Sequence, residues 1–440
     1  MSGRRWAGCG ALCRLLPALM VVAGSILVAQ GAERAEFETW SVDPHTTGVL
    51  LADHRAPVVE VRLEFPVGRW SDWARAAGAV EAFRIQRFDP ERRLLRQSDE
   101  LAVDLRLSVG GRHALLWASA LSRDLDRLRE LIVEVLGNRD LDRAQVTRWS
   151  REAKIGWSSN QKLPGFVVER LAHERCLAEG DPRLDGWREP RKLQRNVTAL
   201  LETRDEILRR PGRLIALAGD VDRAAAERFA SGLLPAPLED APTDSLGLQA
   251  ADCRAGEGEE SAALRGLTQS TLAWARPALT LDDPRYPAFL IADHVLAGHF
   301  RSRLYDALRH DGGETYGVNS SADADPVPGV YRVRTFTRAG NEAVVTRKVR
   351  SALTRFAAEG IAERERAEAV SFLLGRLAFR EQSPGDRMAR YLSERRQGLE
   401  PGGFARLRER AAALSLDEVN AFIAEFYHPD SFVPIRVVPR

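Results

Sequence analysis

The chain has 440 residues, of which 44% are hydrophobic and 29% are charged, a composition typical of globular rather than disordered or fibrous proteins. Its 64 basic and 62 acidic residues nearly cancel, for a formal net charge of +2. This balance excludes a large positively charged surface that would attract nucleic acid or an anionic membrane. At about 100 to 200 residues per domain, the length predicts two or three domains.

Residues 1–32 have the order of a secretory signal peptide. Arg4 and Arg5 precede an uncharged run, residues 15–29, and small residues follow as far as Ala32. The run is shorter than the roughly 18 residues expected of a spanning helix. We therefore expect cleavage near Ala32, no membrane span in the mature chain, and a periplasmic or secreted location. An uncleaved anchor is the alternative.

The four cysteines fall into two groups. Cys9 and Cys13 lie before the apolar run and are expected to leave with the signal peptide. Cys176 and Cys253 belong to the mature chain. They predict either one disulfide in an oxidising compartment or two free thiols, and the sequence does not choose between them.

Strand patterns dominate the start of the mature chain. Residues 48–52 and 59–65, separated by the turn-like residues 53–57, predict a β-hairpin with one buried face. Residues 101–107 alternate in the same way, and an apolar strand at 114–120 returns after two glycines, which predicts a second hairpin.

Helices follow these strands. Ser122 is the expected N-cap of a helix that ends at Gly137 and has apolar residues at a period of 3.6. A further helix at 197–209 leads into an apolar strand at 214–218. Strand pairs followed by helices predict an α+β layer with helices on one face of an antiparallel sheet.

The second half repeats this plan after a linker at residues 236–261, which is rich in Pro, Ala, Gly and acidic residues. Ser415 and Glu418 form a capping box that opens its last helix. We therefore predict two similar domains, 33–235 and 262–440. The elements expected in the second are strands at 267–274, 330–337 and 433–438 and helices at 287–296 and 342–356.

Three segments together resemble the zinc peptidase family M16, whose members include pitrilysin, insulin-degrading enzyme and the mitochondrial processing peptidases. Residues 53–59 and 65–68 are similar to its first two strands, and residues 217–222 to a strand and turn late in its first domain. The most specific segment is 299–309 followed by 316–318, which resembles the motif in which an Arg and a Tyr seven residues apart reach the active site.

The resemblance implies a fold and a mode of binding. The fold has two similar M16-type (LuxS/metallohydrolase-like) α+β domains, with antiparallel sheets and helices, that clamp around a chamber. A peptide substrate would lie there extended against a sheet edge. Arg309 would hold the peptide backbone, and the hydroxyl of Tyr316 would donate to the oxyanion at the scissile carbonyl.

The zinc motif of active members is missing. They bind zinc through HxxEH on one helix, with a Glu further along as the third protein ligand. The corresponding positions here are Glu81, Arg84 and Ile85, and Glu152 is the nearest candidate for the third ligand. Ile85 has no donor atom, and Arg84 can neither accept a proton nor sit beside a dication.

No other metal motif replaces it, since no two of the eight histidines are four residues apart on one helical face. We therefore expect no cofactor and no metal in this chain, and no catalytic residue that works without a partner. The leading hypothesis is a non-catalytic, exported subunit, inactive alone, that forms a heterodimer with an HxxEH-bearing M16 chain and supplies Arg309 and Tyr316 to it. The alternatives are a stand-alone peptide-binding or scaffold protein and an active peptidase with unorthodox ligands.

Overall fold

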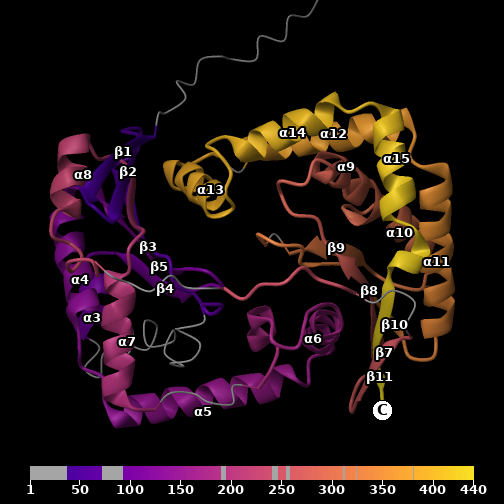
Figure 1. Ribbon diagram of the computed structural model, residues 1–440, viewed down its shortest axis with the longest axis horizontal. Helices are drawn as coiled ribbons and strands as arrows, with labels where there is room; N and C mark the ends of the chain where they lie inside the picture. The colour runs from indigo at the N-terminus through magenta and orange to yellow at the C-terminus, as the bar shows by residue number, and fades with distance from the viewer. Residues whose placement is uncertain are drawn as a thin grey trace, which may run out of the picture. The chain divides into compact units, whose positions relative to one another are not determined.

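The computed structural model of the protein shows two β-sheets with helices packed against them (Figure 1). The predicted α+β class is therefore confirmed. The predicted signal peptide, residues 1–32, lies outside the described residues, and no helix in the described part of the chain is long and apolar enough to cross a membrane. The residues described are 37–71, 93–189, 195–239, 246–253, 258–310, 313–323, 325–379 and 381–440.

The first sheet has the strand order β1-β2-β6-β3-β5-β4. Its neighbouring strands run antiparallel, as expected, except at one place, where β2 and β6 are parallel. Parallel neighbours need a long crossover connection, and the chain between these two strands includes several helices. The strands are β1 (Glu38–Asp43), β2 (Thr46–Ala52), β3 (Val58–Phe65), β4 (Asp104–Val109), β5 (Ala114–Leu121) and β6 (Arg213–Gly219).

The hairpin predicted from residues 48–52 and 59–65 does not form. Strand β6 lies between β2 and β3, so that Leu217 is opposite Leu50 on one side and Val61 on the other. Every residue of β6 is buried. A strand this apolar is most stable in the middle of a sheet, where both neighbours bond its backbone and both its faces are covered.

The second predicted hairpin is confirmed as β4 and β5, which pair antiparallel. The helix after it is also present, as α4 (Leu125–Gly137), with the expected apolar face buried. Ser122 is not its N-cap, however. The Ser122 hydroxyl donates to Asp220 at 2.6 Å, and the helix begins three residues later, after a 3-10 turn. An N-cap side chain accepts from a backbone amide, whereas the Ser122 hydroxyl donates to a carboxylate.

The second sheet confirms the repeated plan. Its order, β7-β11-β8-β10-β9, is that of the first sheet without β1. The parallel pair also recurs, because β7 and β11 run parallel as β2 and β6 do. The domain boundaries predicted at 32/33, 235/236 and 261/262 stay predictions. The strands are β7 (Glu260–Leu264), β8 (Gln269–Pro277), β9 (Val318–Ala322), β10 (Val330–Arg338) and β11 (Val433–Pro439).

Helices of each half cover one face of its own sheet. In the first half, α4, α7 and α8 share a core with β3 and β5; in the second half, α9, α11 and α15 share a core with β8 and β10 (Figure 1). The capping box of Ser415 and Glu418 is confirmed at the start of α15. The helices are α3 (Arg93–Glu100), α7 (Val197–Arg209), α8 (Arg223–Ala230), α9 (Tyr286–Ala297), α10 (Arg303–Tyr305), α11 (Glu342–Glu359), α12 (Glu363–Phe379), α14 (Gly403–Ala413) and α15 (Leu416–Phe426).

The other face of the second sheet is covered by a helix from the first half. Helix α6 (Pro164–Cys176) packs on β8 and β11, and it is reached through the long helix α5 (Arg143–Asn160). Val167 and Val168 join a core with Ala273 and Ala275 of β8. Both faces of β8 are therefore apolar and buried, unlike a strand with one side in water.

The other face of the first sheet meets a helix from the second half, α13 (Pro384–Arg396). Strand β3 alternates core residues with Glu60, Arg62 and Glu64, so the face opposite the core is charged. Arg62 donates to the carbonyl of Gly385 at 3.2 Å, and Arg396 of α13 pairs with Glu64. Each half thus contributes one helix to the sheet of the other.

Cys176 and Cys253 form a disulfide, the first of the two arrangements that the sequence left open. Their Cα atoms lie 4.0 Å apart, and the bond closes a loop between residues 77 positions apart. Cys176 is the last residue of α6, and both cysteines are buried in the core that α6 shares with the second sheet. The disulfide therefore joins the end of α6 to the segment that precedes β7, the first strand of the second sheet.

Replacing both cysteines by serine should lower the free energy of unfolding by about 4.5 kcal/mol, the chain-entropy value for a loop of this length. The unfolded chain gains the freedom that the bond removes. Urea unfolding of the wild-type and double-variant proteins measures the difference. Reduced wild-type protein is the control, and an unchanged midpoint in both would contradict a stabilising role.

Candidate functional site

Arg309 and Tyr316 lie on the segment that joins α10 to β9. Arg309 is exposed and belongs to a π-helical turn, Asp306–His310. Its guanidinium donates to the hydroxyl of Tyr305 and stands 5.3 Å from the centre of that ring. Tyr305 itself is buried. The guanidinium of Arg309 is thus held by Tyr305 and is still in reach of solvent. Turns of π-helix are rare in proteins, and those that occur are often at functional sites.

Tyr316 is 76% exposed, a large value for an aromatic side chain. The backbone beside it is nevertheless anchored. The amide of Gly317 donates to the Thr315 hydroxyl at 3.2 Å, and the carbonyl of Gly317 accepts from Thr335 of β10 at 2.8 Å. The Tyr316 ring therefore projects from a fixed backbone, and the fold itself uses little of its surface.

Glu314 anchors the same segment from the other side. Its carboxylate accepts from the side-chain amide of Asn341 and lies 3.2 Å from the Lys348 ammonium of α11. These hydrogen bonds lower the pKa of Glu314. The arrangement presents a cation and a phenol hydroxyl, both hydrogen-bond donors, on a braced loop. Chemically it suits binding of a carbonyl or an anionic oxygen.

The positions of the missing zinc motif, Glu81, Arg84 and Ile85, lie outside the described residues. Glu152, the candidate third ligand, is exposed on α5. Arg148 and Arg151 precede it along the helix, and Lys154 follows it. Among the described residues, no three His, Cys, Asp or Glu side chains gather closely enough to hold a metal ion. The donor set does not fit a catalytic zinc, because Ile85 has no ligating atom and Glu152 sits among cations.

Two histidines of the second half stack on each other. The rings of His294 and His299 lie 4.6 Å apart, and Phe372 of α12 also stacks on His294, at 4.2 Å. Burial, with the nearby His299 and Arg376, lowers the pKa of His294 to about 4. His294 is therefore uncharged at neutral pH and serves as a packing ring.

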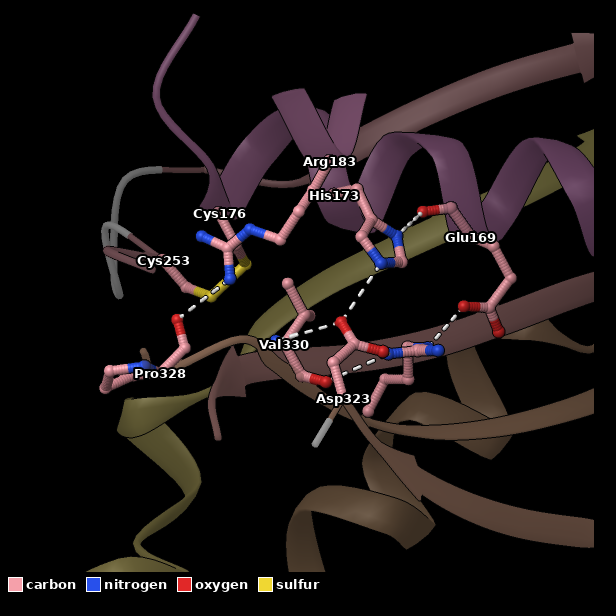
Figure 2. The surroundings of a disulfide bond; sticks show 9 residues. Glu169, His173, Cys176, Arg183, Cys253, Asp323, Pro328 and Val330 are labelled. Atoms are coloured by element: carbon pink, nitrogen blue, oxygen red, sulfur yellow. Dashed lines mark hydrogen bonds and ion pairs between the residues drawn. A yellow bond between two sulfur atoms is a disulfide. The ribbon is translucent and has the colours of Figure 1, made fainter. Parts of the chain in front are cut away.

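A buried ionic cluster that the sequence did not reveal surrounds the disulfide (Figure 2). His173 of α6 has both ring nitrogens near oxygen atoms: Nδ1 lies 2.7 Å from the Glu169 carbonyl, and Nε2 lies 3.1 Å from the Asp323 carboxylate. Arg332 of β10 donates to Asp323 at 2.7 Å and also pairs with Glu169. The cluster thus links α6 to strand β10 and to Asp323, the residue that follows β9.

Asp323 is the centre of this cluster. Burial by itself would raise its pKa, but the hydrogen bond from His173 and the charge of Arg332 hold the pKa of Asp323 well below its usual range. The amide of Val330 donates to the same carboxylate at 3.1 Å. A carboxylate with this many donors is a structural anion rather than a proton acceptor.

A second buried cation completes the surroundings of the disulfide. Arg183 binds Asp181 with two hydrogen bonds, of 3.0 and 2.7 Å, and donates to Asp325 at 3.1 Å. It also donates to the Pro328 carbonyl at 3.4 Å (Figure 2). Its side chain is 3% exposed. An Asp followed two residues later by an Arg is common in sequences, so only the folded structure reveals that Asp181 and Arg183 form a buried ion pair.

The comparison of sequences places part of the chain in a known family. Residues 196–373 match the family described as "Peptidase M16 inactive domain". This confirms the resemblance to M16 drawn from the sequence. No curated protein sequence matches the chain significantly.

Solved structures share the fold over almost the whole chain. An M16 inactive domain from Pseudomonas fluorescens has a TM-score of 0.77 at 18% identity, covering 92% of this chain and 98% of the other. A Helicobacter pylori protease has 0.78 at 11% identity, covering 92% and 100%. The periplasmic protease PqqL from Escherichia coli has 0.71 at 13% identity, covering 98% of this chain but 49% of its own. At these identities the likeness concerns the fold.

Asp323→Asn should reduce the free energy of unfolding at pH 7 by about 3 kcal/mol, because it leaves Arg332 and His173 facing a neutral group. The folded-state pKa of Asp323 is depressed, so its carboxylate stabilises the fold above the ordinary carboxyl pKa of about 4 and loses this contribution as the pH falls toward the folded value. Urea unfolding at pH 7 and pH 3 should therefore show the wild type and the variant converging in acid.

Asp430→Asn is the matched control. Asp430 pairs with Arg350 on the surface, with the two side chains 62% and 60% exposed, and exposed pairs contribute about 1 kcal/mol or less. Equal losses for the two variants at pH 7 would contradict the role of the buried cluster.

Proposed function

We propose that this chain, an M16 homologue whose sequence lacks HxxEH, is the non-catalytic subunit of an exported two-chain zinc peptidase. One observation carries the proposal. Tyr316 and Arg309 present two hydrogen-bond donors on a braced segment, while the sequence contains no metal motif of its own. Donors of this kind are useful at an active site whoever supplies the metal.

The work is divided between the two chains. The HxxEH-bearing partner supplies the metal and the base that activates water. In this chain, Arg309 binds the backbone of the peptide substrate, and the Tyr316 hydroxyl donates to the carbonyl oxygen at which negative charge develops. A donor aimed at developing charge stabilises the transition state more than the bound peptide, so it raises the rate rather than only the affinity.

The lengths of similar proteins support two chains. This chain matches 49% of the periplasmic protease PqqL, so a pair of chains of this size would have about the length of that protease. The family model that matches residues 196–373 is described as inactive. A partner with the active motif would complete such a pair.

Export is supported by two separate features. Arg4, Arg5 and the apolar run before Ala32 have the order of a signal peptide. In addition, Cys176 and Cys253 are joined in a disulfide, which persists in oxidising compartments such as the periplasm. The proposed location is periplasmic or secreted.

The alternative function is a stand-alone peptide-binding or scaffold protein. It would use the same exposed donors for binding but would have no catalytic partner. It predicts peptide binding without hydrolysis in every mixture of proteins. An active peptidase with unorthodox ligands is a third candidate, and it predicts stoichiometric zinc in this chain alone.

Tyr316→Phe should lower the peptidase rate of the two-chain complex by roughly 10²- to 10³-fold, the usual effect of losing one oxyanion donor. The phenylalanine keeps the ring and removes only the hydroxyl. The rate of peptide hydrolysis at saturating substrate measures it. Tyr286→Phe, on α9, is the control, and a rate for Tyr316→Phe equal to the control's would exclude the proposed role.

Metal content and activity distinguish the three candidate functions. The purified chain should contain no stoichiometric zinc and hydrolyse no peptide, and activity should appear when a co-encoded HxxEH chain is added. Elemental analysis and a fluorogenic peptide assay measure both. Zinc and hydrolysis in this chain alone would reject the subunit proposal, whereas peptide binding with no activity after mixing would favour the stand-alone function.

A further inference from the structure

The exposed side of α5 concentrates positive charge. The helix carries Arg143, Arg148, Arg151 and Lys154 against one acidic residue, Glu152. This differs from the chain as a whole, where 64 basic residues stand against 62 acidic ones. The four cations are all exposed.

The helical period places these cations on one side. At 100° per residue, Arg143, Arg151 and Lys154 fall within about 80° of one another, and Arg148 lies about 60° further round. The buried residues of α5, Val146 and Ser150, lie about 60° and 20° from Arg143 on its other side, so Arg148 and Arg151 are the cations that point farthest from the core. Val146 belongs to a small core with Leu200 of α7, which fixes the direction in which the cations face.

The described residues do not neutralise this face. Within the part of the chain that the structure describes, none of the four cations is paired with a carboxylate, although many other arginines are. Arg148, Arg151 and Lys154 follow one another at intervals of three residues, a spacing at which like charges destabilise a helix. The repulsion among these cations therefore destabilises the helix, and no described ion pair offsets it.

Arg143, Ala144, Thr147, Arg148 and Arg151 line a shallow depression that is open to solvent over most of its extent. The small side chains of Ala144 and Thr147 lie between the arginines and leave room there.

We infer that the α5 face, Arg143, Arg148, Arg151 and Lys154, binds a carboxylate-rich segment of a polypeptide. Guanidinium groups bind carboxylates with two parallel hydrogen bonds, which favours Asp and Glu side chains. A nucleic acid would need a basic field along many phosphates, whereas the charge here is confined to one helix of a nearly neutral chain. The site requires only this chain, so it stands or falls independently of the proposed two-chain peptidase.

Fluorescence anisotropy with the purified chain tests the inference. The probes are a labelled peptide with six consecutive Glu residues and its isomer with Gln in their place. The acidic peptide should bind at 50 mM NaCl at least tenfold more tightly than the Gln peptide. Binding should disappear at 1 M NaCl, where the Debye length is about 3 Å. Equal affinity for the two peptides would overturn the inference.

Variants locate the site. The triple variant Arg143→Gln, Arg148→Gln and Arg151→Gln should weaken binding of the Glu peptide about tenfold, since three exposed charge contacts each contribute a factor of about two. Arg-to-Lys replacements at these positions should restore part of the affinity. The control removes the same charge from exposed arginines on α11 and α14, with Arg347→Gln, Arg355→Gln and Arg410→Gln, and should bind as the wild type does.

Two outcomes would overturn the assignment. An equal loss in the control variant would mean that only net charge matters. Competition by a single-stranded oligonucleotide of the same charge, as effective as the Glu peptide itself, would mean a surface for any polyanion rather than a polypeptide site. Circular dichroism of all variants checks that α5 is still helical.

Discussion

A β-sheet has two faces, and in this protein each half covers only one face of its own sheet. Helix α6 of the first half packs on the second sheet, and helix α13 of the second half lies against the first. The two contacts differ in chemistry. Strands β8 and β11 offer α6 an apolar surface, whereas β3 offers α13 the charges of Glu60, Arg62 and Glu64. Neither sheet is fully covered unless both halves are folded, so the stability of one depends on the other.

The candidate site inherits this dependence. The segment that carries Arg309 and Tyr316 runs between α10 and the edge strand β9, and it is held by Thr335 of β10 and by Lys348 of α11. Strand β10 is in turn held by the cluster of His173, Asp323 and Arg332 on the other face of the sheet. A side chain can be 76% exposed and still be well placed, because the backbone beneath it is fixed by elements from both halves.

Charge is used in two ways. Most buried or half-buried ions are paired across elements that are far apart in sequence, as in Arg183 with Asp325 or Arg396 with Glu64. These pairs specify which surfaces meet more than they add net stability, since the cost of desolvation offsets much of the attraction. The cations of α5 are different, because they are exposed and none of them forms an ion pair with a described carboxylate. The near-zero net charge of the chain conceals this contrast.

Much of the local structure could be predicted from the sequence. Alternation and the 3.6-residue period identified β5, β10, α4 and α11, and the capping box of Ser415 and Glu418 marked the start of α15. These signals are local, since they report which side of an element is apolar or which side chain can bond the first amides. The absence of HxxEH is likewise a property of the sequence alone, and so is the Arg309 and Tyr316 motif from which the resemblance to M16 was drawn.

Other features were decided by tertiary structure. Nothing in the sequence indicated that β6 lies between β2 and β3 or that Ser122 bonds Asp220 instead of capping a helix. The sequence allowed a disulfide between Cys176 and Cys253, but only the structure chose it over two free thiols. His173 and Asp323 are 150 residues apart, and nothing in either segment names the other. The physical reason is the same in each case. Periodicity shows that a face must be buried, but the partner that buries it is chosen by long-range packing, and only the folded chain brings the two surfaces together.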